Sequence, residues 1–261
     1  MKQFTIFGNP VAHSKSPNMH NGAFKGLGVD ANYSKTLLKD GSQLRDKFFE
    51  LNIDGANITV PHKEEAFRIC DVLDSFAQKV GAVNTIIRKN DKLYGYNTDA
   101  LGFLKAISLF NIDIKTILII GAGGTSKAIS KILQDEGYSV TILNRSKSRL
   151  EDFKDFKRYT FEDFKSQKYD LIVNSTSAGL EDEHLPAPKD ILENLLSNAK
   201  ASVDVIYGKE TPFLKLSKEF NLPSKDGADM LLFQGVIAFE KFTNHQFNFQ
   251  EIEKFMKRAF E

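Results

Sequence analysis

The chain has 261 residues, of which 41% are hydrophobic and 26% are charged, and 35 basic against 34 acidic side chains leave a formal net charge of +1. This balance excludes a disordered protein, and the small net charge provides no strong field for nucleic acid or an anionic membrane. A single cysteine excludes an internal disulfide and a cysteine cluster for zinc. No apolar run approaches the roughly 18 residues of a membrane span. We therefore expect a soluble, cytoplasmic protein without a nucleic acid or membrane partner.

The first hundred residues alternate strand patterns with helix patterns. Five segments have the pattern of a strand, and the last two of them have the spacing of a hairpin: residues 4–7, 33–38, 56–60, 83–88 and 92–96. Ser16 and Pro17 open the first helix, with Ser16 as its expected N-cap and Pro17 at its first position. A second helix is expected to begin near Pro61.

From residue 116 the strand patterns become nearly continuous apolar runs, which are typical of strands buried on both faces of a parallel sheet. These runs lie at residues 116–120, 139–143, 169–173 and 202–207. A helix between the first two is expected to end at Gly137. The chain closes with helices around residues 230–242 and 249–260, and Asn248 and Glu251 have the spacing of a capping box at the start of the last.

The alternation of strands and helices predicts an α/β protein of two domains. At about 150 residues per domain, the length fits two modest domains. The first is an N-terminal α/β domain, and the second is a doubly wound, Rossmann-like nucleotide-binding domain. The C-terminal helices are expected to return to the first domain. The expected boundaries place residues 1–101 with 230–261 in one domain and residues 102–229 in the other.

A glycine-rich turn joins the first buried strand of the second domain to the following helix. It contains Gly121, Ala122, Gly123, Gly124 and Thr125. Glycines at such a turn let the backbone approach a pyrophosphate, whose charge meets the free N–H groups and the positive end of the helix. The next residue, a serine, occupies the third glycine position of the usual fingerprint, so the pattern is imperfect. The alternative is a turn with no ligand.

The second strand of this domain ends in a basic turn, which bears on the choice of dinucleotide. Asn144, Arg145, Lys147 and Arg149 lie there, and no carboxylate follows until Glu151. An NAD site places an acidic residue on the ribose 2′-hydroxyl at this point, whereas an NADP site uses arginine for the 2′-phosphate. The turn therefore favours NADP, and the alternative is a solvated basic turn.

The first domain contains a candidate anion site at the start of its first helix. Ser14 and Ser16 bring two hydroxyl groups to a helix N-terminus with unpaired N–H groups, which suits a carboxylate. The alternative is that Ser16 only caps the helix.

A second group of polar residues could carry chemistry. Asn57 and Thr59 alternate along one strand, so they are expected on the same face. Lys63 falls in the first turn of the next helix, where the positive end of the helix dipole disfavours a cation and assists release of its proton. Asp99 opens a later helix and either interacts with that helix dipole or orients Lys63. Spacing alone leaves both roles of Asp99 open. It also leaves open that Lys63 is simply exposed to water.

Together these motifs resemble the shikimate dehydrogenase family, and the resemblance runs nearly from end to end. The matching segments are residues 8–17 (GNPVAHSKSP), 57–63 (NITVPHK), 81–85 (GAVNT), 95–99 (GYNTD), 121–124 (GAGG), 144–145 (NR), 174–177 (NSTS), 211–214 (TPFL), 226–227 (DG) and 230–234 (MLLFQ). Each motif is modest alone, but their shared order is highly specific.

The resemblance implies an NADP-linked interconversion of 3-dehydroshikimate and shikimate, a step in chorismate and aromatic amino acid biosynthesis. Lys63 matches the catalytic lysine and Asp99 its partner. The positions implied for the substrate are Ser14 and Ser16 for the carboxylate, Thr59, Asn84, Asp99 and Gln234 for the ring hydroxyls, and Tyr207 lining the same pocket. Those implied for NADP are Gly121 to Thr125 for the pyrophosphate, Asn144, Arg145 and Arg149 for the adenosine ribose and its phosphate, and Val205 and Gly227 for the nicotinamide end. No metal is implied, and His13 and His62 are interpreted as structural.

Several positions depart from the family pattern. Asp229 stands where many members have glycine, and a carboxylate there puts the Gly227 contact in doubt. Gly235 replaces a common alanine, and Phe242 and Asn244 replace a usual Trp and Gly. Two alternatives remain. One is a quinate/shikimate dehydrogenase of broader specificity, and the other is a non-catalytic NADP-binding regulatory relative. The sequence also leaves open whether the protein is a monomer or a homodimer.

Overall fold

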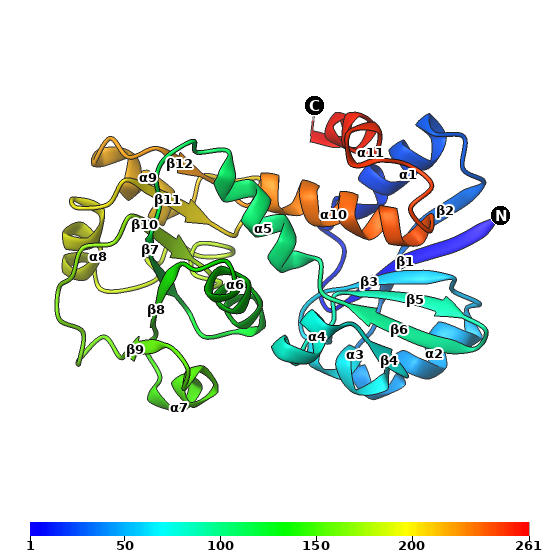
Figure 1. Cartoon of the computed structure of the whole chain (residues 1–261), viewed down its shortest axis with the longest axis horizontal. Helices are drawn as coiled ribbons and strands as arrows, with labels where there is room; N and C mark the ends of the chain where they lie inside the picture. The colour runs from blue at the N-terminus through cyan, green and yellow to red at the C-terminus, as the bar shows by residue number, and fades with distance from the viewer. Residues whose placement is uncertain (261) are drawn as a thin grey trace. The chain divides into compact units, whose positions relative to one another are not determined.

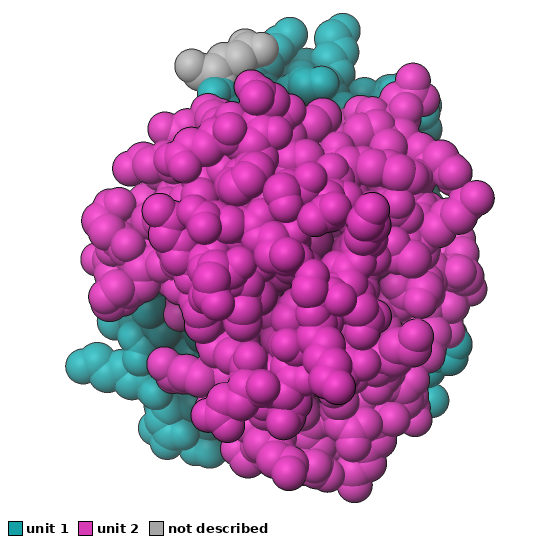
Figure 2. Space-filling model, turned by 90° about the vertical axis from the view of Figure 1, so that its left-hand side faces the viewer, with its two compact units in different colours: residues 1–102, 232–261 teal, residues 103–231 magenta. Residues whose placement is uncertain are grey.

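The computed structural model describes residues 1–260, which form two compact units (Figure 2). Unit 1 comprises Met1–Gly102 and Leu232–Glu261, and unit 2 comprises Phe103–Leu231. The chain passes between them inside two helices, α5 (Asp99–Ser108) and α10 (Ala228–Phe242). The unit boundaries fall at residues 102 and 232, against expected domain boundaries at residues 101 and 230.

Unit 1 contains a mixed six-stranded sheet in the order β2-β1-β3-β5-β6-β4 (Figure 1). Its strands are β1 (Lys2–Gly8), β2 (Ala31–Leu37), β3 (Gly55–Ile58), β4 (Val72–Leu73), β5 (Thr85–Lys89) and β6 (Lys92–Tyr96). β1 is parallel to β2 and β3, whereas β5 is antiparallel to β3 and β6. The β5–β6 hairpin is the one predicted from the sequence. Asn90 and Asp91 turn it with φ of 49° and 62°, as a two-residue hairpin turn requires.

Helices cover both faces of this sheet. They are α1 (Ser16–Gly26), α2 (Leu44–Glu50), α3 (Lys63–Ile69), α4 (Ser75–Val80), α11 (Phe249–Met256) and short 3₁₀ turns at Gly41–Gln43 and Lys257–Phe260. Figure 1 shows α2, α3 and α4 on one face and α1 and α11 on the other. Successive strand residues point to opposite faces, so the Phe4 ring of β1 packs on Phe24 and the Phe7 ring on Phe48. This two-sided packing buries β1 continuously from residue 4 to residue 8.

The first turn of α1 differs from the sequence-based expectation. Lys15 occupies the N-cap position, and Ser16 is the first residue of the helix with Pro17 second. Ser14 Oγ accepts a hydrogen bond from the Ser16 N–H at 3.2 Å. The prediction of Ser16 as the cap is therefore wrong. Ser14 satisfies that backbone donor, which leaves the Ser16 hydroxyl free of a capping role.

Unit 2 contains a six-stranded, wholly parallel sheet in the order β12-β11-β10-β7-β8-β9. Its strands are β7 (Thr116–Ile120), β8 (Ser139–Leu143), β9 (Lys157–Tyr159), β10 (Leu171–Asn174), β11 (Ala201–Asp204) and β12 (Ser224–Lys225). Counted within the unit, the order is 6-5-4-1-2-3, that of a dinucleotide-binding sheet. Such sheets bind ligands at the carboxyl ends of the strands where the order reverses, here β7 and β10.

Helices connect the strands of unit 2. They are α6 (Gly124–Asp135), α7 (Lys147–Leu150), α8 (Lys189–Leu196) and α9 (Pro212–Glu219), with a 3₁₀ turn at Glu151–Phe153. The predicted end of α6 at Gly137 is confirmed within two residues, and this glycine has a left-handed φ of 86°. The strand expected over residues 202–207 ends instead at Asp204. Its carboxylate accepts the Ile206 N–H at 3.0 Å and turns the chain out of the sheet.

None of the helices in residues 1–260 has the length and apolar character that crossing a bilayer requires.

Asp170 ties together the amino ends of three segments of unit 2. Its Oδ2 accepts the N–H groups of Lys115 and Thr116 at 2.8 and 2.9 Å, and its Oδ1 pairs with Lys200 Nζ at 2.8 Å. Burial by itself raises the pKa of this carboxyl, but the hydrogen bonds from Lys200, Thr116 and Lys115 outweigh it and hold the pKa below its usual range.

We expect Asp170→Asn to lower the free energy of unfolding at pH 7 by about 1–3 kcal/mol, because it removes charge-assisted hydrogen bonds. The pKa is lower in the folded chain than the unfolded value of about 3.9, so the stabilisation exists above that value and is lost as the pH falls through the folded pKa. Urea unfolding should show a difference from wild type that shrinks below about pH 4. The exposed Glu162→Gln variant is the control. A difference equal at pH 7 and pH 3 would contradict this role.

Candidate active site

Lys63 and Asp99 form an ion pair in unit 1. Each is the first residue of a helix, α3 and α5 respectively, and Lys63 Nζ donates to Asp99 Oδ2 at 2.6 Å. Their side chains are 17% and 12% exposed, so solvent screens the pair only in part. The two residues are 36 positions apart in the sequence, and the fold brings them together, so Asp99 is the partner of Lys63.

His62 fixes the turn that leads into Lys63. It is 4% exposed, and its Nε2 bonds to the backbone oxygen of Leu38 at 2.6 Å. The Lys63 carbonyl in turn accepts the N–H of Val83 at 2.9 Å. The backbone of Leu38 thus holds the His62 ring in place, which fits the interpretation of His62 as a structural residue. His13 is exposed.

Asn84 orients the Asp99 carboxylate. Its Nδ2 donates to Asp99 Oδ1 at 2.8 Å, and its Oδ1 accepts the Thr98 N–H at 2.7 Å. The two bonds define which way the amide faces. Gln234, buried on α10, brings its Oε1 within 3.4 Å of the same Nδ2. Three residues of the predicted substrate site, Asn84, Asp99 and Gln234, are therefore brought together.

A buried polar chain continues from Asn84 toward α1. The Thr85 hydroxyl donates to Asn84 Oδ1 at 3.2 Å and accepts from Asn57 Nδ2 at 3.0 Å, and the Tyr33 hydroxyl donates to Asn57 Oδ1 at 2.6 Å. Burial raises the pKa of Tyr33 well above its ordinary value, although hydrogen bonds from Asn57 and Ser16 oppose this. Asn57 is thus committed to the network.

Sequence reasoning missed Tyr33, Thr85 and Thr98 as parts of this network. The available signal was a tyrosine and an asparagine in strands that are otherwise buried, because a buried hydroxyl or amide requires a partner. Thr59 lies one residue beyond the end of β3, where its N–H still donates to the Phe7 oxygen of β1 at 2.9 Å. It is partly buried beside Gly8, and its position on the same strand face as Asn57 stays a prediction.

His20 lies beside this network without joining it. Its ring stacks on Tyr33 with centroids 4.3 Å apart and planes 2° from parallel. Neither ring nitrogen has a hydrogen-bond partner within residues 1–260. Burial lowers the pKa of His20 to about 3, against a weaker opposing effect of Asn57. The ring therefore packs as a neutral aromatic group.

The glycine turn of unit 2 fits a dinucleotide. Gly121 has φ of 113°, and a Cβ there would lie 3.0 Å from Thr176 Cγ2, so the site requires glycine. A Cβ on Gly123 or Gly124 would meet nothing within 4 Å, so this side of the turn is open to a phosphate. Ser126, the imperfect position of the fingerprint, accepts the Gly123 N–H at 3.3 Å and closes the turn.

The basic turn after β8 also fits the cofactor expected from the sequence. Asn144 ends the strand and donates from Nδ2 to the Ser146 oxygen at 3.0 Å. Arg145 and Arg149 are exposed, and neither forms an ion pair with an acidic group of residues 1–260. The nearby Lys127 and Lys131, by contrast, pair with Asp152 and Asp155 at 2.8 Å. The two arginines are thus available to an anionic ligand.

Val205 and Gly227 touch closely. A Cβ on Gly227 would lie 2.1 Å from the Val205 carbonyl oxygen, and the Gly227 N–H donates to the Ile206 oxygen at 2.9 Å. Asp229 leaves this contact intact, because its carboxylate pairs with Lys225 Nζ at 2.7 Å. Tyr207 follows in the same loop and is half-buried.

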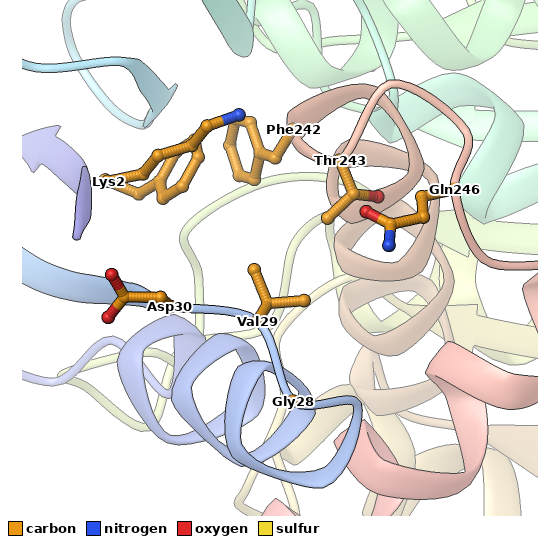
Figure 3. Close-up of a pocket in the computed structure, with 8 residues that line it drawn as sticks. Lys2, Gly28, Val29, Asp30, Phe242, Thr243 and Gln246 are labelled. Carbon is orange, nitrogen blue, oxygen red and sulfur yellow. The ribbon is translucent and has the colours of Figure 1, made fainter.

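A separate pocket of about 310 Å³ lies in unit 1, between the start of β1, the turn before β2 and the end of α10 (Figure 3). Figure 3 shows Lys2, Asp30 and Phe242 among the side chains that line it. Lys2 and Asp30 stand at the amino ends of β1 and β2, opposite the strand end that leads to Lys63, and Phe242 ends α10. Asp30 is already paired with the N-terminal amine at 2.9 Å. In residues 1–260 no group of three His, Cys, Asp or Glu side chains is arranged to hold a metal ion.

Comparison with known proteins supplies the family. Residues 6–86 match the model of the shikimate dehydrogenase substrate binding domain, and residues 104–199 match that of shikimate / quinate 5-dehydrogenase. The NADP(+) shikimate dehydrogenase of Helicobacter hepaticus is 45% identical, covering 96% of this chain and 94% of that protein. The corresponding enzyme of Helicobacter pylori is 42% identical, covering 100% and 99%.

A solved structure extends the likeness to three dimensions. Shikimate 5-dehydrogenase of Thermus thermophilus, in complex with NADP(H) and shikimate, is 34% identical with a TM-score of 0.86, over 99% of this chain and 100% of that one. The shared sequence motifs, the two sheets and the full-length identity agree, and the chain belongs to the shikimate dehydrogenase family.

Proposed function

We propose that the chain catalyses the NADPH-dependent, reversible reduction of 3-dehydroshikimate to shikimate in chorismate and aromatic amino acid biosynthesis. The observation that carries the proposal is the Lys63–Asp99 pair at 2.6 Å, with Asp99 held from its other oxygen by Asn84. Such an arrangement provides an acid whose position is set before substrate arrives.

The Lys63–Asp99 dyad supplies the proton of the reaction. NADPH, when bound, supplies the hydride that reduces the C3 carbonyl of the substrate. Lys63 donates a proton to the oxygen that becomes the C3 hydroxyl, and its charge stabilises the alkoxide as it forms. Asp99 keeps the ammonium group in place through Oδ2, while Asn84 prevents rotation of the carboxylate through Oδ1.

The remaining substrate contacts follow from the family motifs. Ser14 and Ser16 at the start of α1 would bind the carboxylate, and this role is supported by the Ser16 hydroxyl being free of the helix cap. Thr59, Asn84 and Gln234 would bind the ring hydroxyls with Asp99. Tyr207, in unit 2, would line the pocket.

NADP would bind to unit 2. Gly121, Ala122, Gly123, Gly124 and Thr125 would hold the pyrophosphate, a role supported by the open space beside Gly123 and Gly124. Asn144 would bind the adenosine ribose, with Arg145 and Arg149 at its 2′-phosphate. Val205 and Gly227 would meet the nicotinamide end. We accordingly assign unit 1 to the substrate and unit 2 to the cofactor.

We further propose that the protein acts in the cytoplasm on this small-molecule substrate as a monomer or a homodimer. Light scattering of the purified protein measures its mass in solution and tests the oligomeric part of this proposal.

The first test follows reduced nicotinamide by absorbance with shikimate or quinate, each with NADP and with NAD. We expect fast turnover only with shikimate and NADP. Comparable rates with quinate or NAD would favour the quinate/shikimate branch and contradict the phosphate role of Arg145 and Arg149. NADPH binding without turnover of any pair would favour a regulatory relative.

We expect Lys63→Ala to fold and to bind NADPH but to lose about 10²–10⁴-fold in kcat, the usual contribution of a positioned acid. Circular dichroism and fluorescence titration of NADPH check folding and binding. Lys39→Ala removes an exposed lysine of the same unit and should keep wild-type activity. Near-full activity of Lys63→Ala would refute the role of Lys63 as the acid.

Removal of both arginines, Arg145→Ala with Arg149→Ala, should raise the KM for NADPH by about 10- to 100-fold, because charge-assisted hydrogen bonds to the 2′-phosphate are lost. The KM for NADH, which lacks that phosphate, is the internal control and should stay within about twofold. An equal change with both cofactors would show that the arginines act on some other part of the dinucleotide.

A further inference from the structure

Asp204 is a buried carboxylate that the proposed chemistry does not use. It ends β11, has no exposed surface, and forms no ion pair with a basic group of residues 1–260. Burial raises its pKa, although three hydrogen bonds oppose that effect. Burying a carboxyl group costs free energy unless hydrogen-bond donors satisfy its oxygens. The donors that bind Asp204 therefore indicate which segments it holds together.

The three donors come from three different segments. Asn174 Nδ2 at the end of β10 donates to Oδ2 at 3.0 Å, and the hydroxyl of Thr211, the N-cap of α9, donates to the same oxygen at 2.6 Å. The Ile206 N–H, in the turn after β11, donates to Oδ1 at 3.0 Å. One side chain thus joins the carboxyl ends of two neighbouring strands to the start of a helix.

One branch of this network leads to the glycine turn. Asn174 Oδ1 accepts both the N–H and the hydroxyl of Thr176, at 3.0 and 2.8 Å. Thr176 lies against Gly121, and Ser175 Oγ hydrogen-bonds to Ser126 Oγ at 2.6 Å. Because Ser126 closes the turn through Gly123, the position of the β10 end is transmitted to the pyrophosphate-binding backbone.

The other branch leads to the segment assigned to the nicotinamide end. The bond from the Ile206 N–H to Asp204 bends the chain directly after β11. That bend presents the carbonyl oxygens of Val205 and Ile206 to Gly227, which donates to the second and touches the first. Both ends of the proposed cofactor site therefore depend on the same carboxyl group.

We propose that Asp204 is a positioning residue for the cofactor site, acting through Asn174 on the glycine turn and through Ile206 on the Val205–Gly227 contact. This inference rests on the proposed function for the identity of the ligand. Asp204 itself touches no reacting atom.

Hydrogen-bond chemistry makes this role testable. In Asp204→Asn, the new amide can face Asn174 and Thr211 with its oxygen, but its NH₂ then faces the Ile206 N–H, and one donor stays unpaired. In the other orientation, its NH₂ faces Asn174 Nδ2, so two donors oppose each other at that contact instead. An unpaired buried donor costs a full desolvation penalty.

Exchanging the two side chains removes the conflict. In the double variant Asn174→Asp with Asp204→Asn, the amide at 204 donates to the carboxylate at 174 and to the Thr211 oxygen, and its own oxygen accepts the Ile206 N–H. The carboxylate at 174 still accepts from Thr176. The Ile206 N–H, the Thr176 groups and the bond between residues 174 and 204 are satisfied again without a change of net charge, and only the Thr211 hydroxyl hydrogen loses the acceptor it has in wild type.

The experiment compares wild type, Asp204→Asn, Asn174→Asp and the exchanged double variant. NADPH affinity is measured by fluorescence titration, the KM for shikimate by steady-state kinetics, and stability by thermal unfolding. We expect each single variant to bind NADPH about tenfold more weakly with the KM for shikimate changed less than about twofold, and the exchange to recover most of the affinity. Asp163→Asn, which neutralises an exposed carboxylate hydrogen-bonded to Thr160 elsewhere in unit 2, is the control and should bind NADPH normally.

Three results would overturn the inference: an unchanged NADPH affinity in Asp204→Asn whatever its stability, an equal loss for both substrates, or an exchanged variant no better than the singles. If neither single variant folds, the exchanged variant decides alone. Wild-type-like NADPH affinity then supports the role, and an affinity about tenfold weaker opposes it. Because NADPH affinity is measured without turnover, a wild type inactive on shikimate would refute the proposed function and leave the comparison of NADPH affinities intact.

Discussion

The pairing of Lys63 with Asp99 depends on two helices that begin at the same region of one sheet. Four residues separate the end of β3 at residue 58 from the start of α3 at residue 63, and two separate the end of β6 at residue 96 from the start of α5 at residue 99. Each helix therefore starts where a sheet strand has just ended. Asp99 is favoured at its helix start and Lys63 is disfavoured at its own. The ion pair with Asp99 offsets the unfavourable placement of the Lys63 cation at the start of α3.

This constraint explains why so many uncharged side chains surround the dyad. A carboxylate free to rotate would hold the lysine in several places, and Asn84 removes that freedom by donating to Asp99 and accepting from Thr98. Asn84 is then held by Thr85, and the chain of bonds continues through Asn57 to Tyr33. Every member is buried and hydrogen-bonded, which makes the network rigid. It also reaches the start of α1, where the substrate carboxylate is proposed to bind.

Much of this arrangement could be read from the sequence, for reasons that differ between elements. The strands of unit 2 were recognisable because burial on both faces leaves continuous apolar runs, and β7 and β8 match their predicted bounds. β9 and β12 have three and two residues, too few for any pattern to appear. The prediction of Ser16 as the N-cap of α1 is wrong because the neighbouring Ser14 accepts the hydrogen bond from the helix N–H. The Lys63–Asp99 contact and the Tyr33–Asn57 bond join distant segments, and spacing along the chain contains no information about them.

Both units hold a carboxylate with an asparagine beside a strand: Asn84 directly precedes β5 and Asn174 is the last residue of β10. In unit 1 the amide of Asn84 donates to one carboxylate and accepts a backbone N–H, and in unit 2 the amide of Asn174 does the same with Asp204 and Thr176. An amide suits this position because it supplies a donor and an acceptor without adding charge. Asp99 also pairs with Lys63, the residue proposed to donate the proton. Asp204 accepts hydrogen bonds only from neutral donors and forms no ion pair with a basic group of residues 1–260. The carboxylate–amide pair is therefore a positioning element in both units, and it becomes part of a catalytic site where a cation is placed against it.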